Sequence, residues 1–241
     1  MGIQERDRKV YRPLRRAGLE VIPNAVPAGT MPFVLGYGAE DLAGGFSHRY
    51  DTSRLVERLN ADWYDLALSL GLFDYRREFL VQLPQGTRSH RAALQHLHSG
   101  NTAPALWTRV RLLDRWDIMG RGAASAFLGV HSGHPGFGMM ALDGSVYVAA
   151  STGETGIEVL VVHHPDRSEN VLQHLEWITR YDSPYVNREF KERIAVWLAG
   201  RQGVFRVADD EVPDGLTDRV RSQMARAAAG TVPRKTYPRL S

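Results

Sequence analysis

Cysteine is absent from this chain of 241 residues, and its absence excludes three kinds of chemistry. Without a thiol the protein has no disulfide bond, no thiolate ligand for a metal ion and no cysteine nucleophile. A chain without cysteine suits a reducing compartment, so we expect the protein to reside in the cytoplasm.

Long apolar runs are also missing. No stretch approaches the roughly 18 to 20 consecutive apolar residues that a helix needs to cross a bilayer. The first residues, MGIQERDRKVYRPLRRAG, are charged where a secretory signal would be apolar. We therefore expect neither export nor contact with a membrane. The hydrophobic share of 43% is nevertheless enough for a sizeable buried core.

Lysine is scarce, because only Lys9, Lys191 and Lys235 occur among the 30 basic residues. The net charge of +3 is well short of the charge typical of nucleic-acid-binding proteins. The basic residues that cluster at the two ends of the chain are Arg6, Arg8, Lys9, Arg12, Arg15 and Arg16, and Arg219, Arg221, Arg226, Arg234, Lys235 and Arg239. Acidic residues interrupt both clusters, so nucleic-acid association through these ends is an alternative and not the leading hypothesis.

Motifs of several large enzyme classes are missing as well. The chain has no GxxxxGKS or GxxxxGKT phosphate loop, no HExxH zinc motif and no GxSxG nucleophile elbow. The stretch FVLGYGAED begins like a dinucleotide-binding turn, but Asp41 stands where the third glycine belongs and would repel a phosphate. We therefore expect no cofactor.

What the chain does contain is a series of short apolar segments between Ala123 and Trp177, separated by Gly, Pro and Asp-Gly turns. Apolar runs of this length between turn residues are typical of sheet strands. The dipeptide Asp143-Gly144 predicts a type I′ hairpin turn between strands that end at Leu142 and begin at Ser145.

A helical period precedes this region. The large apolar residues that recur at helical spacing are Leu55, Leu59, Trp63, Leu66 and Leu70. This spacing predicts a helix with one buried stripe, capped by Asp51 or Thr52. The other expected elements are strands at Leu19–Ile22, Phe33–Leu35, Phe79–Leu83 and Val110–Leu113, and helices from Thr87 or Ser89 to His98, Ser168 to Arg180, Asn187 to Ala199 and Leu216 to Ala229.

These elements predict an α/β or α+β fold, with a mixed sheet of roughly five to seven strands flanked by helices in a single domain. We expect a basic arm and a Pro/Gly-rich segment over residues 1–50 and the core over residues 51–200. Residues 201–241 are expected to form a basic helix and a mobile tail.

Polar side chains near the predicted strand ends are the candidates for binding a ligand: His131, His134, Asp143, Ser151, Glu154, Glu158 and His163. An enzyme would need them to converge in one pocket. The histidines on predicted helices, His90, His96, His98 and His174, have polar neighbours and are expected at the surface.

Particular combinations of these candidates would imply particular chemistries. Ser151, His131 and Asp143 would make a nucleophilic triad only in the matching geometry. Glu154 and Glu158, four residues apart, would share a face of an extended strand, as the paired acids of ADP-ribosyl-transferring sites do.

A divalent metal would need the loop of His131 and His134 to meet that of His163 and His164, with Asp166 beside them. Adjacent histidines on a strand point to opposite faces, so His163 and His164 cannot both serve one site. We therefore expect no metal.

The order of elements from Phe79 to Trp177 resembles a phospholipase D-like half-domain, with REFLVQLP, SHRAALQHLHSG, WTRVRLLD and GFGMMALDGSVYVAAS in the places of its successive elements. Asp143 and Gly144 stand at the family's aspartate-glycine pair, whereas Gly136 and Gly138 stand where it carries its catalytic histidine and lysine. Without a nucleophile and a phosphate-holding cation, the resemblance implies a degenerate, non-catalytic core, as in ligand-sensing parts of bacterial regulators.

The leading hypothesis from the sequence is therefore a cytoplasmic, non-catalytic ligand-binding or regulatory protein. One alternative is a transferase or hydrolase of specialised metabolism that uses a His/Glu/Asp pocket at the strand ends. A second is the nucleic-acid-associated protein described above.

Overall fold

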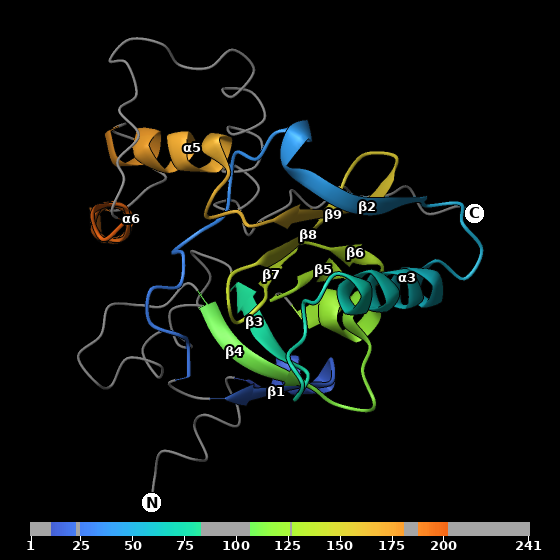
Figure 1. Cartoon of the computed structure of the whole chain (residues 1–241). Helices are drawn as coiled ribbons and strands as arrows, with labels where there is room; N and C mark the ends of the chain where they lie inside the picture. Colours follow the sequence, from blue (N-terminus) through green and yellow to red (C-terminus); the bar gives the residue numbers. More distant parts are fainter. Residues whose placement is uncertain (1–10, 23–24, 83–106, 126, 181–187, 202–241) are drawn as a thin grey trace, which may run out of the picture.

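The computed structural model describes residues 11–22, 25–82, 107–125, 127–180 and 188–201, and Figure 1 labels its elements. The helices are α2 (Arg12–Arg16), α3 (Leu55–Ser69), α5 (Glu169–Arg180) and α6 (Arg188–Ala199), with short helical turns η1 (Ala39–Asp41), η2 (Ile118–Gly122) and η3 (Ala123–Ser125). The strands are β1 (Leu19–Ile22), β2 (Leu42–Arg49), β3 (Glu78–Gln82), β4 (Trp107–Leu112), β5 (Gly129–His131), β6 (His134–Pro135), β7 (Phe137–Met140), β8 (Val146–Thr152) and β9 (Gly156–His163).

Most of these strands form one 7-stranded sheet in the order β1-β4-β3-β7-β8-β9-β2, while β5 and β6 form a separate hairpin. The expected class, a sheet flanked by helices, is confirmed. Strand directions differ from the mixed sheet that we expected, because all the strand pairings in the described residues are antiparallel. Antiparallel neighbours need only short connections, which the Gly and Asp-Gly turns between β7, β8 and β9 provide.

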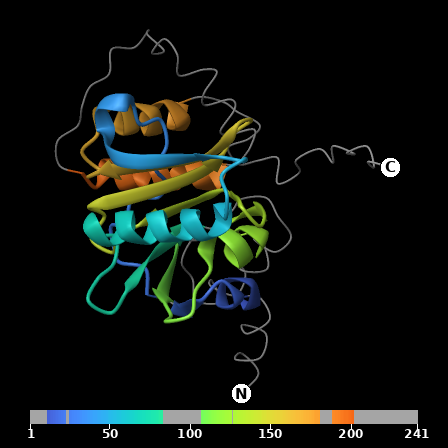
Figure 2. The ribbon, with the colours of Figure 1, turned by 90° about the vertical axis from the view of Figure 1, so that its right-hand side faces the viewer.

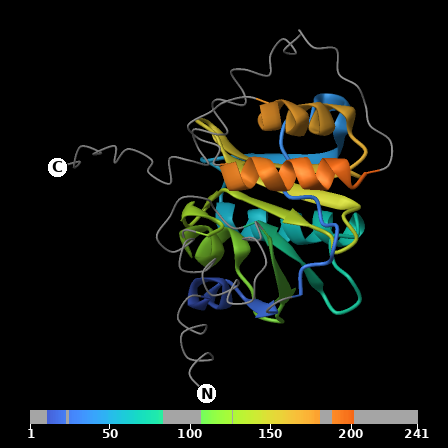
Figure 3. The same ribbon diagram turned by 90° about the vertical axis from the view of Figure 1, so that its left-hand side faces the viewer.

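Helices cover both faces of the sheet. In Figure 2, α3 lies in front of the strands, and in Figure 3, from the opposite side, α6 lies in front with α5 above it. Successive residues of a strand point to opposite faces, so each central strand contributes to two cores. This explains why β7 and most of β8 read as continuous apolar runs and not as an alternation.

The first core lies between the sheet and α2 and α3. Leu59 and Trp63 of α3 are fully buried in it, and Leu55, Leu66 and Leu70 pack at its margin, so the predicted stripe is confirmed. Alternate residues of two central strands face them: Val146, Val148, Ala150, Ile157, Val159 and Val161. The predicted cap is wrong, because the residue before α3 is Arg54 at φ 54 and no side chain caps the helix.

The second core lies between the other face and the helix pair α5 and α6. Both helices were expected from the sequence and lie within a residue of their expected bounds. The sheet contributes Tyr147 and Val162, and the helices contribute Leu175 and Ile194. The remaining expected helices, at residues 87–98 and 216–229, lie outside the described residues.

Both edge strands come from residues 1–50, the segment expected to precede the core. β1 pairs with β4, and β2 pairs with β9. The sequence analysis missed β2, because its glycines and small residues give little apolar alternation. Phe33–Leu35 is wrong as a strand: Val34 and Leu35 are buried in the second core from a loop, so their apolar character reflects burial without a strand.

The Asp143-Gly144 dipeptide lies in the connection between β7 and β8, as predicted, but the turn type is wrong. Gly144 has φ +75 whereas Asp143 is not among the residues with positive φ, and type I′ needs both. The connection is also longer, with the Ala141 amide donating to the Val146 carbonyl at 2.9 Å.

In the part of the chain that the structure describes, no helix has the length and apolar character needed to cross a membrane.

Candidate functional site

The seven side chains predicted to bind a ligand do not gather in one place. β6 lies beside the end of β8, where the Thr152 hydroxyl donates to the Pro135 carbonyl at 2.8 Å. His163 instead pairs with Val146 at the other end of β8. Val146 and Thr152 are the two ends of a seven-residue strand, which spans about 20 Å. His131 and His134 are therefore separated from Asp143 and His163 by the length of the strand.

This separation removes the triad and the metal arrangement. Ser151 lies near one end of β8, whereas Asp143 lies in the turn before the other end, so the two cannot share a histidine. His163 and His164 are likewise remote from His131. Among the described residues, no group of three or more His, Asp or Glu side chains is placed to hold a metal ion.

The paired acids are also separated by the fold. Glu154 lies in the turn before β9, and Glu158 lies within that strand, so they are not part of one extended segment. Glu158 stands opposite Ser151 on one neighbouring strand and Ser47 on the other. All of these side chains are exposed, and the row forms a polar strip on the sheet surface.

His131 and His134 contact each other across the β5–β6 hairpin, with ring centroids 4.6 Å apart. The Tyr50 ring stacks on His134 at 5.3 Å, and its hydroxyl donates to the Gly153 carbonyl at 2.6 Å. These ring contacts and the hydrogen bond of Tyr50 hold the β5–β6 hairpin against the end of β2.

Asp143 serves the turn in which it lies. Its Oδ1 accepts hydrogen bonds from the Ser145 amide at 2.9 Å and from the Ser145 hydroxyl at 2.6 Å. These bonds favour the charged form and lower the pKa of the Asp143 carboxyl. The aspartate is therefore a turn-stabilising group.

Gly138, at the position of the family's lysine, has no room for a side chain. A Cβ there would overlap the Gln82 side-chain oxygen and lie 2.7 Å from the Tyr147 hydroxyl. Gly136, at the histidine position, is open, with nothing nearer than 3.9 Å to such an atom.

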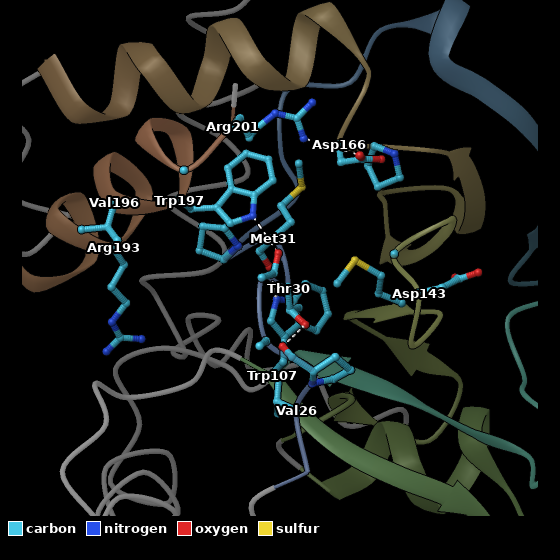
Figure 4. Close-up of a pocket in the computed structure, with 18 of the residues that line it drawn as sticks. Val26, Thr30, Met31, Trp107, Asp143, Asp166, Arg193, Val196, Trp197 and Arg201 are labelled. Carbon is cyan, nitrogen blue, oxygen red and sulfur yellow. Dashed lines mark hydrogen bonds and ion pairs between the residues drawn. The ribbon is translucent and has the colours of Figure 1, made fainter. Parts of the chain in front are cut away.

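A cavity lies elsewhere, between the loop 26–32, the C-terminal half of α6 and the β7–β8 turn (Figure 4). Its volume is about 1050 Å³. Its apolar wall is formed by Val26, Met31, Trp107, Met140, Leu142 and Trp197. We call it the α6 cleft.

Two tryptophans fix the loop that forms one wall of the α6 cleft. The indole N–H of Trp107 donates to the Met31 carbonyl at 2.7 Å, and that of Trp197 donates to the Gly29 carbonyl at 2.9 Å. The Thr30 hydroxyl donates to the Pro27 carbonyl at 2.7 Å and tightens the same loop. Both indole donors are thus satisfied within the protein. Trp107 and Met31 are only 2% and 4% exposed, so the accessible apolar surface of the cleft comes mainly from Trp197, Val26 and Leu142.

Charged groups contribute to one end of the α6 cleft. The Arg201 guanidinium lies 4.9 Å over the Trp197 ring, and its Nη1 lies 3.4 Å from the Asp166 carboxylate. Asp143 and Arg193 also border the cleft, but in Figure 4 both charged ends point away from Trp197 and Met31. Glu192 also lines the cleft and pairs with Arg188; among the charged lining residues, Arg201 has a contact with the Trp197 ring and Asp166 pairs with it.

The sequence analysis missed this cleft. Its residues come from five separate segments, and each has an ordinary local explanation: a Pro/Gly-rich loop, a strand start, a turn between strands, the turn after β9 and a helix end. Trp107 and Trp197 are 90 positions apart in the numbered sequence, and no spacing links them. The Pro/Gly-rich composition of residues 26–32 was visible, but it indicates a loop and not a binding wall.

Two titratable groups are buried away from the cleft. Glu78 is 2% exposed and accepts hydrogen bonds from Arg109 at 2.8 Å and from Arg111 at 3.1 Å. Burial alone would raise the pKa of the Glu78 carboxyl, but the bonds from Arg111 and Arg109 outweigh it and leave the pKa below its ordinary value.

His174 of α5 is the second buried group, and its expected surface position is wrong. The ring is fully buried against Gly36 and Trp177, and neither ring nitrogen has a hydrogen-bond partner among the residues that the structure describes. Desolvation lowers the pKa of the His174 imidazole to about 4. His90, His96 and His98, also expected at the surface, lie outside the described residues.

Comparison with protein-family models, with curated proteins and with solved structures found no match. The phospholipase D-like resemblance therefore stays a prediction.

Proposed function

We propose that this protein binds a small apolar molecule in the α6 cleft and does not transform it. The observation that carries the proposal is a cleft of about 1050 Å³ with the Trp107 and Trp197 indoles in its wall. Ligand sites are typically concave, of this size, and lined by aromatic and aliphatic groups with a few polar atoms.

The distribution of reactive groups supports binding over catalysis. The seven candidate side chains are divided between opposite ends of the central strands. Among these described residues only Asp143 borders the α6 cleft, and its carboxylate accepts a hydrogen bond from Ser145 and points away from the cleft. An enzyme would need an acid, base or nucleophile aimed at its substrate. The missing side chains at Gly136 and Gly138 support the same non-catalytic role.

The cytoplasmic location remains part of this proposal and rests on the absence of cysteine alone. A regulatory role is not needed to explain the cleft. The basic ends, on which nucleic-acid association would depend, lie mostly outside the described residues.

Binding can be tested with N-phenyl-1-naphthylamine, a neutral dye whose fluorescence rises in apolar surroundings. Wild-type protein should bind the dye saturably. Trp197→Ala and Leu142→Glu, which alter opposite walls of the α6 cleft, should each weaken binding at least about tenfold, by loss of contact area and by desolvation of a charge.

Leu68→Glu is the matched control, because Leu68 is an apolar residue of α3 that is 58% exposed on the opposite side of the sheet. It should leave dye affinity unchanged. Circular dichroism at each titration would establish that the variants are folded. Absence of saturable binding, or equal binding by both cleft variants and wild type, would overturn the proposal.

A further inference from the structure

Asp166 and Trp197 position the guanidinium of Arg201 but engage only part of its hydrogen-bonding capacity. Its Nη1 contacts Asp166, and its central carbon lies 4.9 Å from the centroid of the Trp197 ring. In the part of the chain that the structure describes, its side chain makes no other hydrogen bond or ion pair. Among the described residues, the edge formed by Nε and Nη2 therefore carries hydrogen-bond donors without acceptors.

The ion pair that engages Arg201 is weak. Its N···O separation of 3.4 Å exceeds the roughly 2.7 to 2.9 Å of a strong charge-assisted hydrogen bond. The side chains of Arg201 and Asp166 are 33% and 37% exposed, so water screens their attraction. A competing carboxylate can displace Asp166 at low cost, since Asp166 is already partly hydrated.

We infer that the ligand of the α6 cleft is an apolar carboxylic acid, with its carboxylate on Arg201 and its apolar body against Trp197, Val26 and Leu142. This inference rests on the proposed function. An arginine fork binds a carboxylate through parallel N–H···O bonds, which a neutral amide cannot match. The cation–π contact with the Trp197 ring and the ion pair with Asp166 already position the guanidinium, so less side-chain freedom is lost on binding.

Asp166 competes with the ligand for Arg201. It satisfies Arg201 when the cleft holds no anion, and it repels an anion that cannot make the bidentate contact. Removing its charge should therefore strengthen carboxylate binding, which distinguishes this arrangement from a site in which Arg201 and Asp166 act together as a fixed pair.

The test compares 2-naphthoate with 2-naphthamide, two probes of the same shape that differ in charge, by isothermal titration calorimetry at pH 7. Wild type should bind the naphthoate at least about tenfold more tightly than the naphthamide. Arg201→Gln should abolish this preference while keeping amide affinity. Asp166→Asn should increase the preference, and Arg49→Gln, at the exposed end of β2 and outside the cleft, should leave it unchanged.

Equal binding of the two probes by wild type would overturn the carboxylate inference and leave the proposed function intact. A preference that persists in Arg201→Gln would also overturn it, because another cation would then be responsible. Failure of both probes to bind would instead count against the proposed function itself.

Discussion

His174 should make this protein sensitive to mild acid. Its imidazole is fully buried on α5, and neither nitrogen has a partner among the described residues, so the folded state holds it neutral. Desolvation places its pKa at about 4, against an ordinary value of 6.5 in the unfolded chain. Between these values the unfolded chain takes up a proton that the folded protein does not, and folding becomes less favourable as the pH falls.

The size of the effect follows from the two pKa values. At pH 7 both states are largely neutral at this group, and the contribution is small. At pH 5 the free energy of unfolding should be lower by about 2 kcal/mol, and at pH 4 by about 3 kcal/mol. Losses of this size are a large fraction of the stability of an ordinary domain.

Urea unfolding, followed by circular dichroism at pH 7, 6, 5 and 4, measures this term when wild type is compared with His174→Phe. The phenylalanine keeps a ring against Gly36 and Trp177 but cannot be protonated. Between pH 7 and 5 the variant should lose about 2 kcal/mol less than wild type, since all other titrating groups are shared.

His131→Gln is the matched control, because His131 is exposed and should leave the wild-type pH dependence unchanged. A second variant, His174→Leu, shows whether the result depends on how the phenylalanine ring packs. If wild type and both His174 variants lost equal stability between pH 7 and 5, the imidazole would not be held neutral by burial, and the reasoning would be refuted.

Three further substitutions test the packing. Trp63→Ala should lower the free energy of unfolding by about 3 to 5 kcal/mol, whereas Leu68→Ala on the exposed side of α3 should change it by less than about 0.5 kcal/mol; similar losses would place the stripe at the surface. Glu78→Gln should lower the free energy of unfolding by about 2 kcal/mol at pH 7, because charged hydrogen bonds to Arg109 and Arg111 are lost. This difference from wild type should shrink as the pH falls below the ordinary carboxyl pKa of 4.5. A cost that stays constant through acid would show that the Glu78 charge is not what matters. In the same urea titrations, Gly138→Ala should lower the free energy of unfolding by about 1 to 3 kcal/mol, because its methyl group overlaps Gln82 and Tyr147. Gly136→Ala, where the added methyl group meets open space, should change it little. The reverse order would contradict the packing described for β7.

The sequence by itself determined the elements whose signal is local. Helical spacing located α3 with its buried Trp63, and the helices expected at 168–180 and 187–199 coincide with α5 and α6 to within a residue. The Asp143-Gly144 dipeptide marked the β7–β8 connection, because Gly144 adopts the left-handed conformation there. The absence of cysteine excluded thiol chemistry regardless of the fold. The helices and the turn could be predicted because their signals lie in residues only a few positions apart.

Only the tertiary structure decided which segments meet. β2, with its glycines and small residues, becomes an edge strand because β9 offers it a partner, and nothing within residues 42–49 signals that pairing. The same pairing pattern separates His131 from His163 along β8, although both lie at predicted strand ends. His174 has polar sequence neighbours, yet the packing of α5 over Gly36 buries it.

The α6 cleft has the same origin. Trp107 begins a strand, Trp197 ends a helix, and both bind the loop 26–32, so the cleft exists only once three distant segments have packed together. Local periodicity encodes which face of an element is apolar, but the partner of that face is set by long-range pairing and packing, which leave no fixed spacing in the chain.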